Sequence, residues 1–403
     1  ITTLLEMCFS NMEGGMEISL NKIKEDDIIK ILFAENPGIV IQVKDKHKEE
    51  VKKILEDAGI GYVKLGKPTE ERHILVEKGD ATYQFGIDYL RDVWYSTSYL
   101  LDRKQSMNGC AKKRFENYKK QPLEFVFDKS FTGKLSQFGL NPDRRTPTGI
   151  KAAIIREKGT NGEREMAYML YLAGFDVKDV TMTDLVSGRE TLEDINFIVF
   201  CGGFSNSDVL GSAKGWAGAF LFNPKAKAAL DNFYARKDTL SLGVCNGCQL
   251  MIELNLINPD FTKKAKMLHN DSHKFESKFV GVTVPMNRSV MFGSLSGSKL
   301  GIWVAHGEGK FSLPYHEDKY NVVLKYSYDE YPGNPNGSDY SVAGLASPDG
   351  RHLAMMPHLE RSCFPWQNAY YPADRIKNDQ ITPWIEAFVN ARRWVEELSL
   401  IHI

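Results

Sequence analysis

One cysteine, Cys245, stands where the sequence predicts a sharp turn from a strand into a helix. Residues 240–244 before it are apolar and typical of a buried strand, and residues 249–254 after it are typical of a helix. Gly243 and Gly247 flank the cysteine and permit a tight turn. Such a turn exposes a nucleophile at the top of a sheet and points the first helical N–H groups at whatever bonds to the sulfur. The pattern favours a reactive cysteine.

A histidine and a carboxylate lie close together further along the chain, at His358 and Glu360. The histidine could take the proton of Cys245 as a general base and return one to a leaving group. The carboxylate could hold the imidazole in the required tautomer, which would complete a Cys-His-Glu triad. Two plainer interpretations stay open, a loop histidine after Pro357 and a surface ion pair between Glu360 and Arg361.

Cys245 also begins a C-x-x-C pattern that ends at Cys248. A thioredoxin-like redox pair is therefore an alternative function, whereas no second C-x-x-C or paired-histidine motif supports a zinc site. A further alternative is a different cysteine hydrolase or isomerase on a related α/β fold. We expect Cys248 to lie one turn into the helix and to point into the packing.

Two glycines, Gly202 and Gly203, follow the apolar residues 197–200, which are predicted as another buried strand. Glycine permits close approach and unusual dihedral angles, so backbone N–H groups here could stabilise an oxyanion together with the N–H of Asn246. A plain turn after a strand remains the alternative.

Several motifs, in one order, give the chain from about residue 151 a resemblance to a known family. Residues 243–249 and 357–360 resemble the class I (triad) glutamine amidotransferases. Further segments resemble the glutaminase end of the large single-chain phosphoribosylformylglycinamidine synthases: residues 200–211, 215–217, 270–276, 305–309 and 334–338. That family usually has Pro-His-Pro-Glu where this chain has Pro-His-Leu-Glu, so Leu359 makes the loop less rigid.

The resemblance implies that the Cys245 thiolate attacks the side-chain amide of glutamine and that ammonia leaves. It favours the oxyanion-hole interpretation of Gly203 and Asn246. It also implies a set of residues that line the glutamine pocket: Gly202, Gln249, His306, Gly307 and Glu308. In the family the ammonia passes to an ATP-dependent synthetase domain of the same polypeptide, which aminates formylglycinamide ribonucleotide.

ATP and Mg²⁺ therefore belong to the parent enzyme, whereas this chain has no Walker-type loop and we expect no cofactor and no metal site in it. The first residue, Ile1, is not methionine, which suggests a piece of a longer polypeptide, unless the initial residues are simply missing. The upstream synthetase domain is the expected partner, and glutamine the expected substrate.

Three regions are predicted. Residues 1–88 would form the α+β tail of the synthetase domain, with strands at 39–43 and 62–66 and a helix at 48–58. Residues 89–150 would be a connector that docks two domains. Residues 151–403 would form an α/β glutaminase domain with a flavodoxin-like, doubly wound and mostly parallel sheet, because apolar strands alternate with helical segments.

Composition limits the other classes of function. The net charge of the 403 residues is -1, and no long basic run indicates nucleic acid or an anionic membrane surface. We expect neither a membrane span nor a signal peptide, because no apolar stretch approaches the ~18 residues of a spanning helix. Six cysteines in so long a chain do not form a disulfide framework, which favours a reduced, cytoplasmic setting.

Overall fold

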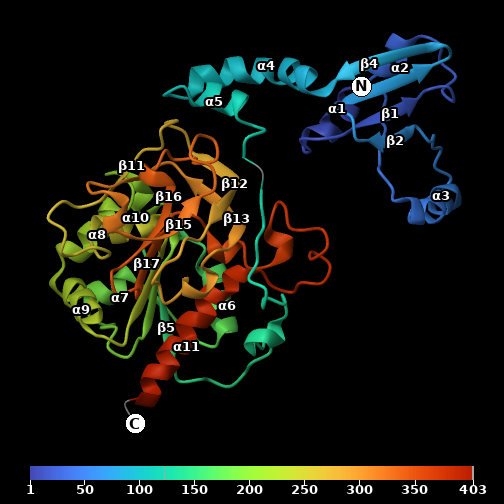
Figure 1. Cartoon of the computed structure of the whole chain (residues 1–403). Helices are drawn as coiled ribbons and strands as arrows, with labels where there is room; N and C mark the ends of the chain where they lie inside the picture. The colour runs from blue at the N-terminus through green and yellow to red at the C-terminus, as the bar shows by residue number, and fades with distance from the viewer. Residues whose placement is uncertain (122, 402–403) are drawn as a thin grey trace. The chain divides into compact units, whose positions relative to one another are not determined.

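The computed structural model describes residues 1–121 and 123–401. The chain divides into two compact units, Ile1–Lys104 and Gln105–Ile403, which we call the first and the second unit. Figure 1 shows the helices and strands of both. The predicted boundaries near residues 88 and 150 stay a prediction.

The first unit is an α+β structure around a four-stranded sheet of order β2-β1-β3-β4. Its strands are β1 (Gly15–Ser19), β2 (Gly66–Thr69), β3 (His73–Lys78) and β4 (Ala81–Gly86). Its helices are α1 (Thr2–Phe9), α2 (Ile28–Phe33), α3 (Lys48–Asp57) and α4 (Ile87–Gln105). Leu5 of α1 and Ile74 of β3 are buried in its small apolar core, so α1 covers the sheet.

One predicted helix of the first unit is confirmed, and two predicted strands are wrong. Helix α3 occupies the expected residues, but residues 39–43 have no regular secondary structure, and of the predicted strand 62–66 only Gly66 is in a strand, as the first residue of β2. Ile39 is 90% exposed and Ile41 is 56% exposed. A β-branched run becomes a strand only where a neighbouring strand pairs its backbone and a core covers one face. Val40 packs against the edge of the first unit's core, but no described strand pairs with this run.

The second unit contains a nine-stranded sheet of order β13-β12-β15-β16-β17-β10-β8-β5-β7. Its parallel half consists of β5 (Lys151–Arg156), β7 (Asp176–Thr181), β8 (Phe197–Phe200), β10 (Leu240–Val244) and β17 (His352–Met355). Numbered along the chain, these strands have the order 2-1-3-4-5, which is the flavodoxin-like arrangement. The predicted fold class is confirmed, and the strands predicted before Gly202 and Cys245 are formed.

The other half of the sheet is antiparallel and was not predicted. It consists of β12 (Glu276–Thr283), β13 (Lys299–His306), β15 (Asn321–Tyr326) and β16 (Val342–Ala346). Two small antiparallel pairs lie beside it: β6 (Thr160–Asn161) with β9 (Gly202–Gly203), and β11 (Lys266–Leu268) with β14 (Lys310–Ser312). Strand β13 matters for the site because its last residues reach Cys245.

Helices cover both faces of the parallel half. Figure 1 shows α8 and α9 on one side, and α6 and α11 on the other. The helices are α5 (Cys110–Glu116), α6 (Glu163–Ala173), α7 (Met182–Ser187), α8 (Lys214–Leu221), α9 (Pro224–Ala235), α10 (Asn246–Glu253) and α11 (Glu386–Ile401). Within residues 1–121 and 123–401, none of the helices combines the length and the apolar character that crossing a membrane requires.

Short 3₁₀ helices connect the larger elements of the chain. They are Asp45–His47, Leu135–Phe138, Ser205–Asp208, Gly293–Leu295, Glu317–Lys319, Asp339–Ser341, Leu359–Arg361, Pro365–Gln367 and Pro383–Ile385. Two of them, Ser205–Asp208 and Leu359–Arg361, lie at the candidate site.

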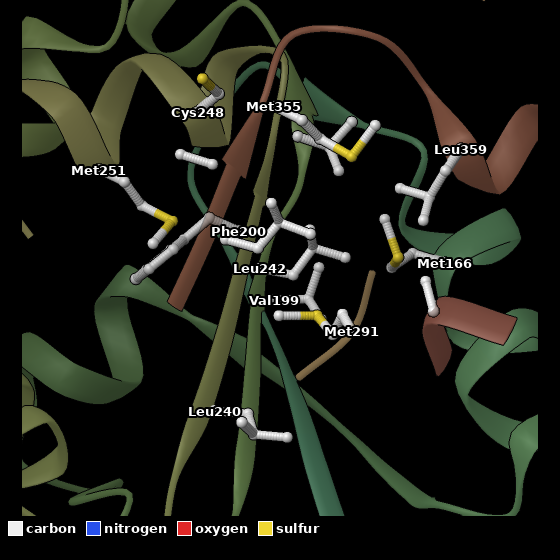
Figure 2. Close-up of a cluster of buried hydrophobic side chains, with 14 of the residues drawn as sticks. Met166, Val199, Phe200, Leu240, Leu242, Cys248, Met251, Met291, Met355 and Leu359 are labelled. Carbon is white, nitrogen blue, oxygen red and sulfur yellow. The ribbon is translucent and has the colours of Figure 1, made fainter. Parts of the chain in front are cut away.

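The apolar core of the second unit surrounds the central parallel strands. Figure 2 shows Phe200 of β8 and Leu242 of β10 in this cluster, with Met251 of α10 beside them. Cys248 of α10 belongs to the same buried cluster and is fully buried. Its side chain therefore serves in packing, as the sequence predicted, and the strand ends that carry the site rest on a filled core.

Candidate active site

Cys245 occupies a strained elbow between β10 and α10. Its φ is 53° and its ψ is -106°, a backbone conformation that a residue with a side chain rarely adopts. The flanking glycines make the elbow possible. A Cβ on Gly243 would lie 2.5 Å from the Gly247 carbonyl oxygen, and a Cβ on Gly247 would lie 2.1 Å from that of Phe200. Larger residues would therefore push α10 away from β8 and β10.

The cysteine lies where three strands end. Its N–H donates to the Met355 carbonyl of β17 at 2.9 Å. Its thiol donates to the Ala305 carbonyl of β13, with 3.5 Å between Sγ and the oxygen. The residue is 5% exposed. The elbow therefore fixes the sulfur at the carboxyl ends of the parallel strands, where ligand chemistry concentrates in such sheets.

His358 and Glu360 form the expected pair directly beyond β17. His358 Nδ1 lies 2.7 Å from Glu360 Oε1, and each residue is 2% exposed. The His358 N–H donates to the Trp303 carbonyl at 2.9 Å, which anchors the loop on β13. Leu359 is fully buried in the core cluster of Figure 2. Packing of this leucine thus holds the loop in place.

The pKa of His358 is strongly perturbed. Burial lowers it, but the Glu360 carboxylate and the Cys245 sulfur together outweigh burial and raise the pKa to about 10. A side-chain hydrogen bond between His358 and Cys245 contributes to this increase. The imidazolium form is therefore favoured between a carboxylate and a sulfur, as expected of a histidine that pairs with a thiolate.

Gly202 and Gly203 lie against the cysteine and the histidine. A Cβ on Gly202 would lie 2.8 Å from His358 Cε1 and 3.4 Å from Cys245 Cβ. Gly203 has a φ of 117°, which favours glycine, and it pairs with Thr160 in the β6–β9 ladder. The structure therefore brings four predicted site positions together: Gly202, Cys245, His358 and Glu360.

A buried chain of hydrogen bonds connects three other predicted residues. Asn246 Oδ1 accepts from the Ser205 N–H at 3.1 Å, and Asn246 Nδ2 donates to Gln249 Oε1 at 2.9 Å. Gln249 Nε2 then donates to the Glu308 carbonyl at 2.7 Å. These side chains tie the loop after β9, helix α10 and the loop after β13 to one another. The Gly307 carbonyl accepts from the Asn270 N–H at 2.9 Å, which holds that last loop from the other side.

His306, the last residue of β13, is an unusual buried histidine. It is 2% exposed, and neither ring nitrogen has a hydrogen-bond partner among the described residues. Burial and the nearby positive charge of His358 together lower its pKa to about 3. The ring is close to Gly309, where a Cβ would lie 2.5 Å from His306 Nδ1. A neutral imidazole with open hydrogen-bonding capacity thus lies beside the charged histidine.

Sequence reasoning missed two features of this site. Asn206, Ser207 and Asp208 have left-handed φ angles of 52°, 56° and 51°, which bend the loop after β9 sharply. Arg361, considered only as a competing ion-pair partner, donates to Asn161 Oδ1 at 2.9 Å while its Nε lies 3.7 Å from Glu360 Oε1. The turn-prone Asn-Ser-Asp run was a usable signal for the first feature, and the adjacency of Glu360 and Arg361 was one for their proximity, whereas no local pattern indicated the hydrogen bond from Arg361 to Asn161.

The described part of the chain contains no group of three or more histidine, cysteine, aspartate or glutamate side chains arranged as metal ligands.

Comparison with known proteins gives a consistent result. Residues 149–395 match the family of CobB/CobQ-like glutamine amidotransferase domains. Phosphoribosylformylglycinamidine synthase of Homo sapiens is 38% identical over 434 residues, which cover 99% of this chain and 32% of that protein. The protein of the same name from Drosophila melanogaster is 36% identical over 433 residues, which cover 98% and 31%. This chain thus spans about a third of the length of these curated relatives.

Among solved structures, PurLQS from Thermotoga maritima is similar to 62% of this chain over its own full length, with 26% sequence identity and a TM-score of 0.45.

Proposed function

This chain belongs to the CobB/CobQ-like glutamine amidotransferase family, and on that premise we propose that its second unit hydrolyses glutamine with a Cys245–His358–Glu360 triad. One observation supports the triad most directly. A carboxylate and a histidine, 2.7 Å apart and both buried, lie beside a cysteine in a strained strand-to-helix elbow. The nucleophile thus lies next to the base, and the base next to the orienting acid, which is the arrangement that covalent catalysis requires.

The proposed reaction proceeds through a thioester. The Cys245 sulfur attacks the side-chain amide carbon of glutamine, and a tetrahedral oxyanion forms. Protonated His358 gives its proton to the amide nitrogen, the C–N bond breaks, and ammonia leaves. His358 then takes a proton from a water molecule that attacks the thioester, and glutamate is released with the thiol restored. Glu360 keeps Nδ1 of the ring protonated, so that Nε2 carries the transferred proton.

We propose that the backbone N–H groups of Gly203 and Asn246 stabilise the oxyanion. Asn246 is the first residue of α10, so its N–H has no partner within the helix and lies at the positive end of the helix dipole. Removing one such donor typically costs ~3 kcal/mol of barrier stabilisation.

The predicted glutamine pocket fits the same geometry. A side chain at Gly202 would crowd His358 and Cys245, and His306 has unused hydrogen-bonding capacity. The buried hydrogen-bond chain through Gln249 sets the position of the loop that contains Gly307 and Glu308. We therefore propose that these five residues surround the bound glutamine.

The wider role follows from the relatives. We propose that the chain is the glutaminase portion of a phosphoribosylformylglycinamidine synthase, and that its ammonia serves the ATP-dependent amination of formylglycinamide ribonucleotide in purine biosynthesis. The expected partner is an upstream synthetase domain of the same polypeptide. We assign ATP and Mg²⁺ to that domain, because this sequence contains no phosphate-cradling glycine-rich loop. All six cysteines are free and buried, in agreement with a reducing, cytoplasmic compartment.

The identity of the nucleophile is tested by alkylation with a glutamine-mimicking electrophile, followed by mass mapping. We expect the label on Cys245, with none on Cys248, since Cys248 is fully buried in the core. Cys245→Ser should abolish labelling and glutamate release, whereas Cys248→Ser should keep both. A label mainly on Cys248 would support the redox alternative. Hydrolysis of another substrate that depends on Cys245, without hydrolysis of glutamine, would support a different cysteine hydrolase.

The link to a synthetase is tested by reconstitution. We expect the 403-residue chain alone to hydrolyse glutamine weakly and to make no amidine. Adding a separately produced upstream synthetase portion with ATP, Mg²⁺ and the ribonucleotide should raise glutamine hydrolysis and yield the amidine. ATP-dependent amidine formation by the chain alone would refute this assignment, and an unchanged rate of hydrolysis on reconstitution would refute the coupling.

A further inference from the structure

Residues 306–309, which we call the pocket loop, follow β13 and contain three of the residues proposed for the glutamine pocket. Two of the four are glycines, Gly307 and Gly309. A Cβ on Gly307 would meet no atom of the described residues within 4 Å, so side-chain packing does not restrain the backbone there. Glycine has the most backbone freedom to lose, and a loop of this composition keeps one shape only if hydrogen bonds from other segments hold it.

Asn270 is fully buried and holds the pocket loop by three hydrogen bonds. Its Nδ2 donates to the His306 carbonyl at 2.7 Å, and its backbone N–H donates to the Gly307 carbonyl at 2.9 Å. Its Oδ1 accepts from the Gly309 N–H at 3.0 Å. One residue outside the loop therefore binds three of the four residues in it.

Asn336 is a second fully buried residue that binds the pocket loop. Its Nδ2 donates to the Gly309 carbonyl and lies 3.2 Å from the Tyr326 hydroxyl. A Cβ on Gly309 would lie 2.7 Å from this Nδ2, so the close approach requires glycine. The Asn336 carbonyl accepts from the Asp271 N–H at 3.0 Å, which connects Asn336 to the residue next to Asn270. The two asparagines thus belong to one buried polar cluster.

Every carbonyl of the pocket loop accepts a hydrogen bond from another segment. Asn270 binds the first two carbonyls and Asn336 binds the last one. The remaining carbonyl, that of Glu308, accepts from Gln249 Nε2 at 2.7 Å. The loop therefore has a fixed shape before any ligand enters. A site that is ordered in advance does not lose affinity to the entropic cost of ordering its loops.

We propose that Asn270 and Asn336 are positioning residues of the glutaminase, which fix the shape of the pocket loop and thereby set the affinity for glutamine. This inference rests on the proposed glutaminase function. It gives a role to residues 270–276 and 334–338, two segments that carry the family resemblance but that the catalytic triad does not use. A purely structural role would change stability and leave the affinity for glutamine as it was.

The test compares alkylation of Cys245 by two electrophiles in the 403-residue chain, a chloromethyl ketone analogue of glutamine and iodoacetamide. In Asn270→Ser and Asn336→Ser, the analogue concentration that gives half the maximal rate should rise about tenfold, the loss that one buried hydrogen bond causes. The maximal rate and the rate with iodoacetamide should stay the same, because the sulfur and the histidine are unchanged.

Asn287→Ser is the matched control. Asn287 is half-buried, and its Nδ2 donates to the Pro285 and Phe292 carbonyls at 2.9 and 3.3 Å. Its loop lies near the start of β17, where the Val290 N–H donates to the Gly350 carbonyl at 2.9 Å, whereas the candidate site lies beyond the end of that strand. This variant should lower the temperature of thermal unfolding and keep the original half-maximal concentration.

Hydrogen exchange of the unmutated protein keeps the inference testable if the serine variants fail to fold. The Gly309 N–H should exchange slowly without glutamine, because Asn270 accepts its hydrogen bond. Rapid exchange there would overturn the inference. It would also be overturned by an unchanged half-maximal concentration in both folded variants, an equal rise in Asn287→Ser, or a matching fall in the iodoacetamide rate.

Failure of the proposed function gives a different result. The unmutated protein would then react with the glutamine analogue no faster than with iodoacetamide, and glutamine would not protect Cys245 from either reagent. That result would refute the glutamine pocket and this inference with it. Protection by glutamine in the unmutated protein, with unaltered asparagine variants, would refute the inference alone.

Discussion

Residues 240–244, which lead to Cys245, and residues 39–43 of the first unit have similar β-favouring sequences but different structures. The first segment is β10, which pairs on both sides with β8 and β17 and is buried along its whole length. The second has no regular structure, and Ile39 is 90% exposed. Propensity is thus realised where neighbouring strands and a core are present. The candidate nucleophile gains its fixed position from those neighbours.

The largest expected effect concerns the base that faces this well-supported elbow. His358→Ala should reduce glutamate release by ~10³-fold or more, because the proton transfers and the pairing with the sulfur are both lost. Release is measured with the synthetase portion added. Circular dichroism should show an intact fold, and His316→Ala, which changes an exposed histidine of the same unit, is the control. Near-normal release from His358→Ala would mean that the base lies elsewhere.

The close packing at the strand ends predicts the next effect. Gly202→Ala should lower activity about 100-fold, because its Cβ would lie 2.8 Å from His358 Cε1 and displace the ring. The φ of Gly202 is not in the left-handed region, so the change is steric and leaves the backbone unstrained. Gly293→Ala is a matched control, since a Cβ there meets nothing within 4 Å. Equal activity in the two variants would show that the ring has room to move.

The contrast between local sequence patterns and long-range strand pairing also explains how far the sequence predicts the candidate site. The elbow could be predicted because Gly243, Cys245 and Gly247 are adjacent in the chain and each obeys a local rule. The pair of His358 and Glu360 was recognisable for the same reason, and Leu359 proved to be held by packing. These are short-range patterns whose geometry depends little on distant residues.

The rest of the site depends on long-range contacts that no local pattern specifies. The chain of hydrogen bonds from Asn246 through Gln249 to Glu308 joins loops that are far apart in sequence. The antiparallel half of the sheet, which brings Ala305 to the sulfur, likewise follows from the pairing of β12 with β13 and β15. Strand propensity does not choose such partners, which is also why residues 39–43 were predicted wrongly.

In the first unit, substitution of a buried isoleucine should cost more stability than substitution of an exposed one. Ile74→Ala should lower the free energy of unfolding of this unit by about 3 kcal/mol, because Ile74 is fully buried in β3. Ile39→Ala should change it by less than about 0.5 kcal/mol. Hydrogen exchange of peptides from β1 and β3 measures both. A similar loss in both variants would show that residues 39–43 are packed in solution.

The smallest effect concerns the buried neutral histidine beside the triad. The pKa of His306 is about 3 in the folded protein, against an ordinary value near 6.5 in the unfolded chain. Above pH 6.5 the ring is neutral in both states, so its contribution to stability is complete. As the pH falls below 6.5, the unfolded chain takes up a proton that the folded protein does not, and stability is lost progressively towards pH 3.

His306→Gln should therefore make the free energy of unfolding less dependent on pH. Between neutral pH and about pH 5, the original protein should lose up to about 2 kcal/mol more than the variant. His358, whose raised pKa gives the opposite sign, and His352, whose pKa is lowered to about 4, are present in both proteins, and their contributions cancel in the difference. Urea unfolding at several pH values measures the slopes. Equal slopes of unfolding free energy against pH in the two proteins would mean that the His306 ring finds a proton acceptor in solution. The ring would then not be the neutral, unpartnered imidazole that sets this edge of the sheet apart from the rest of the core.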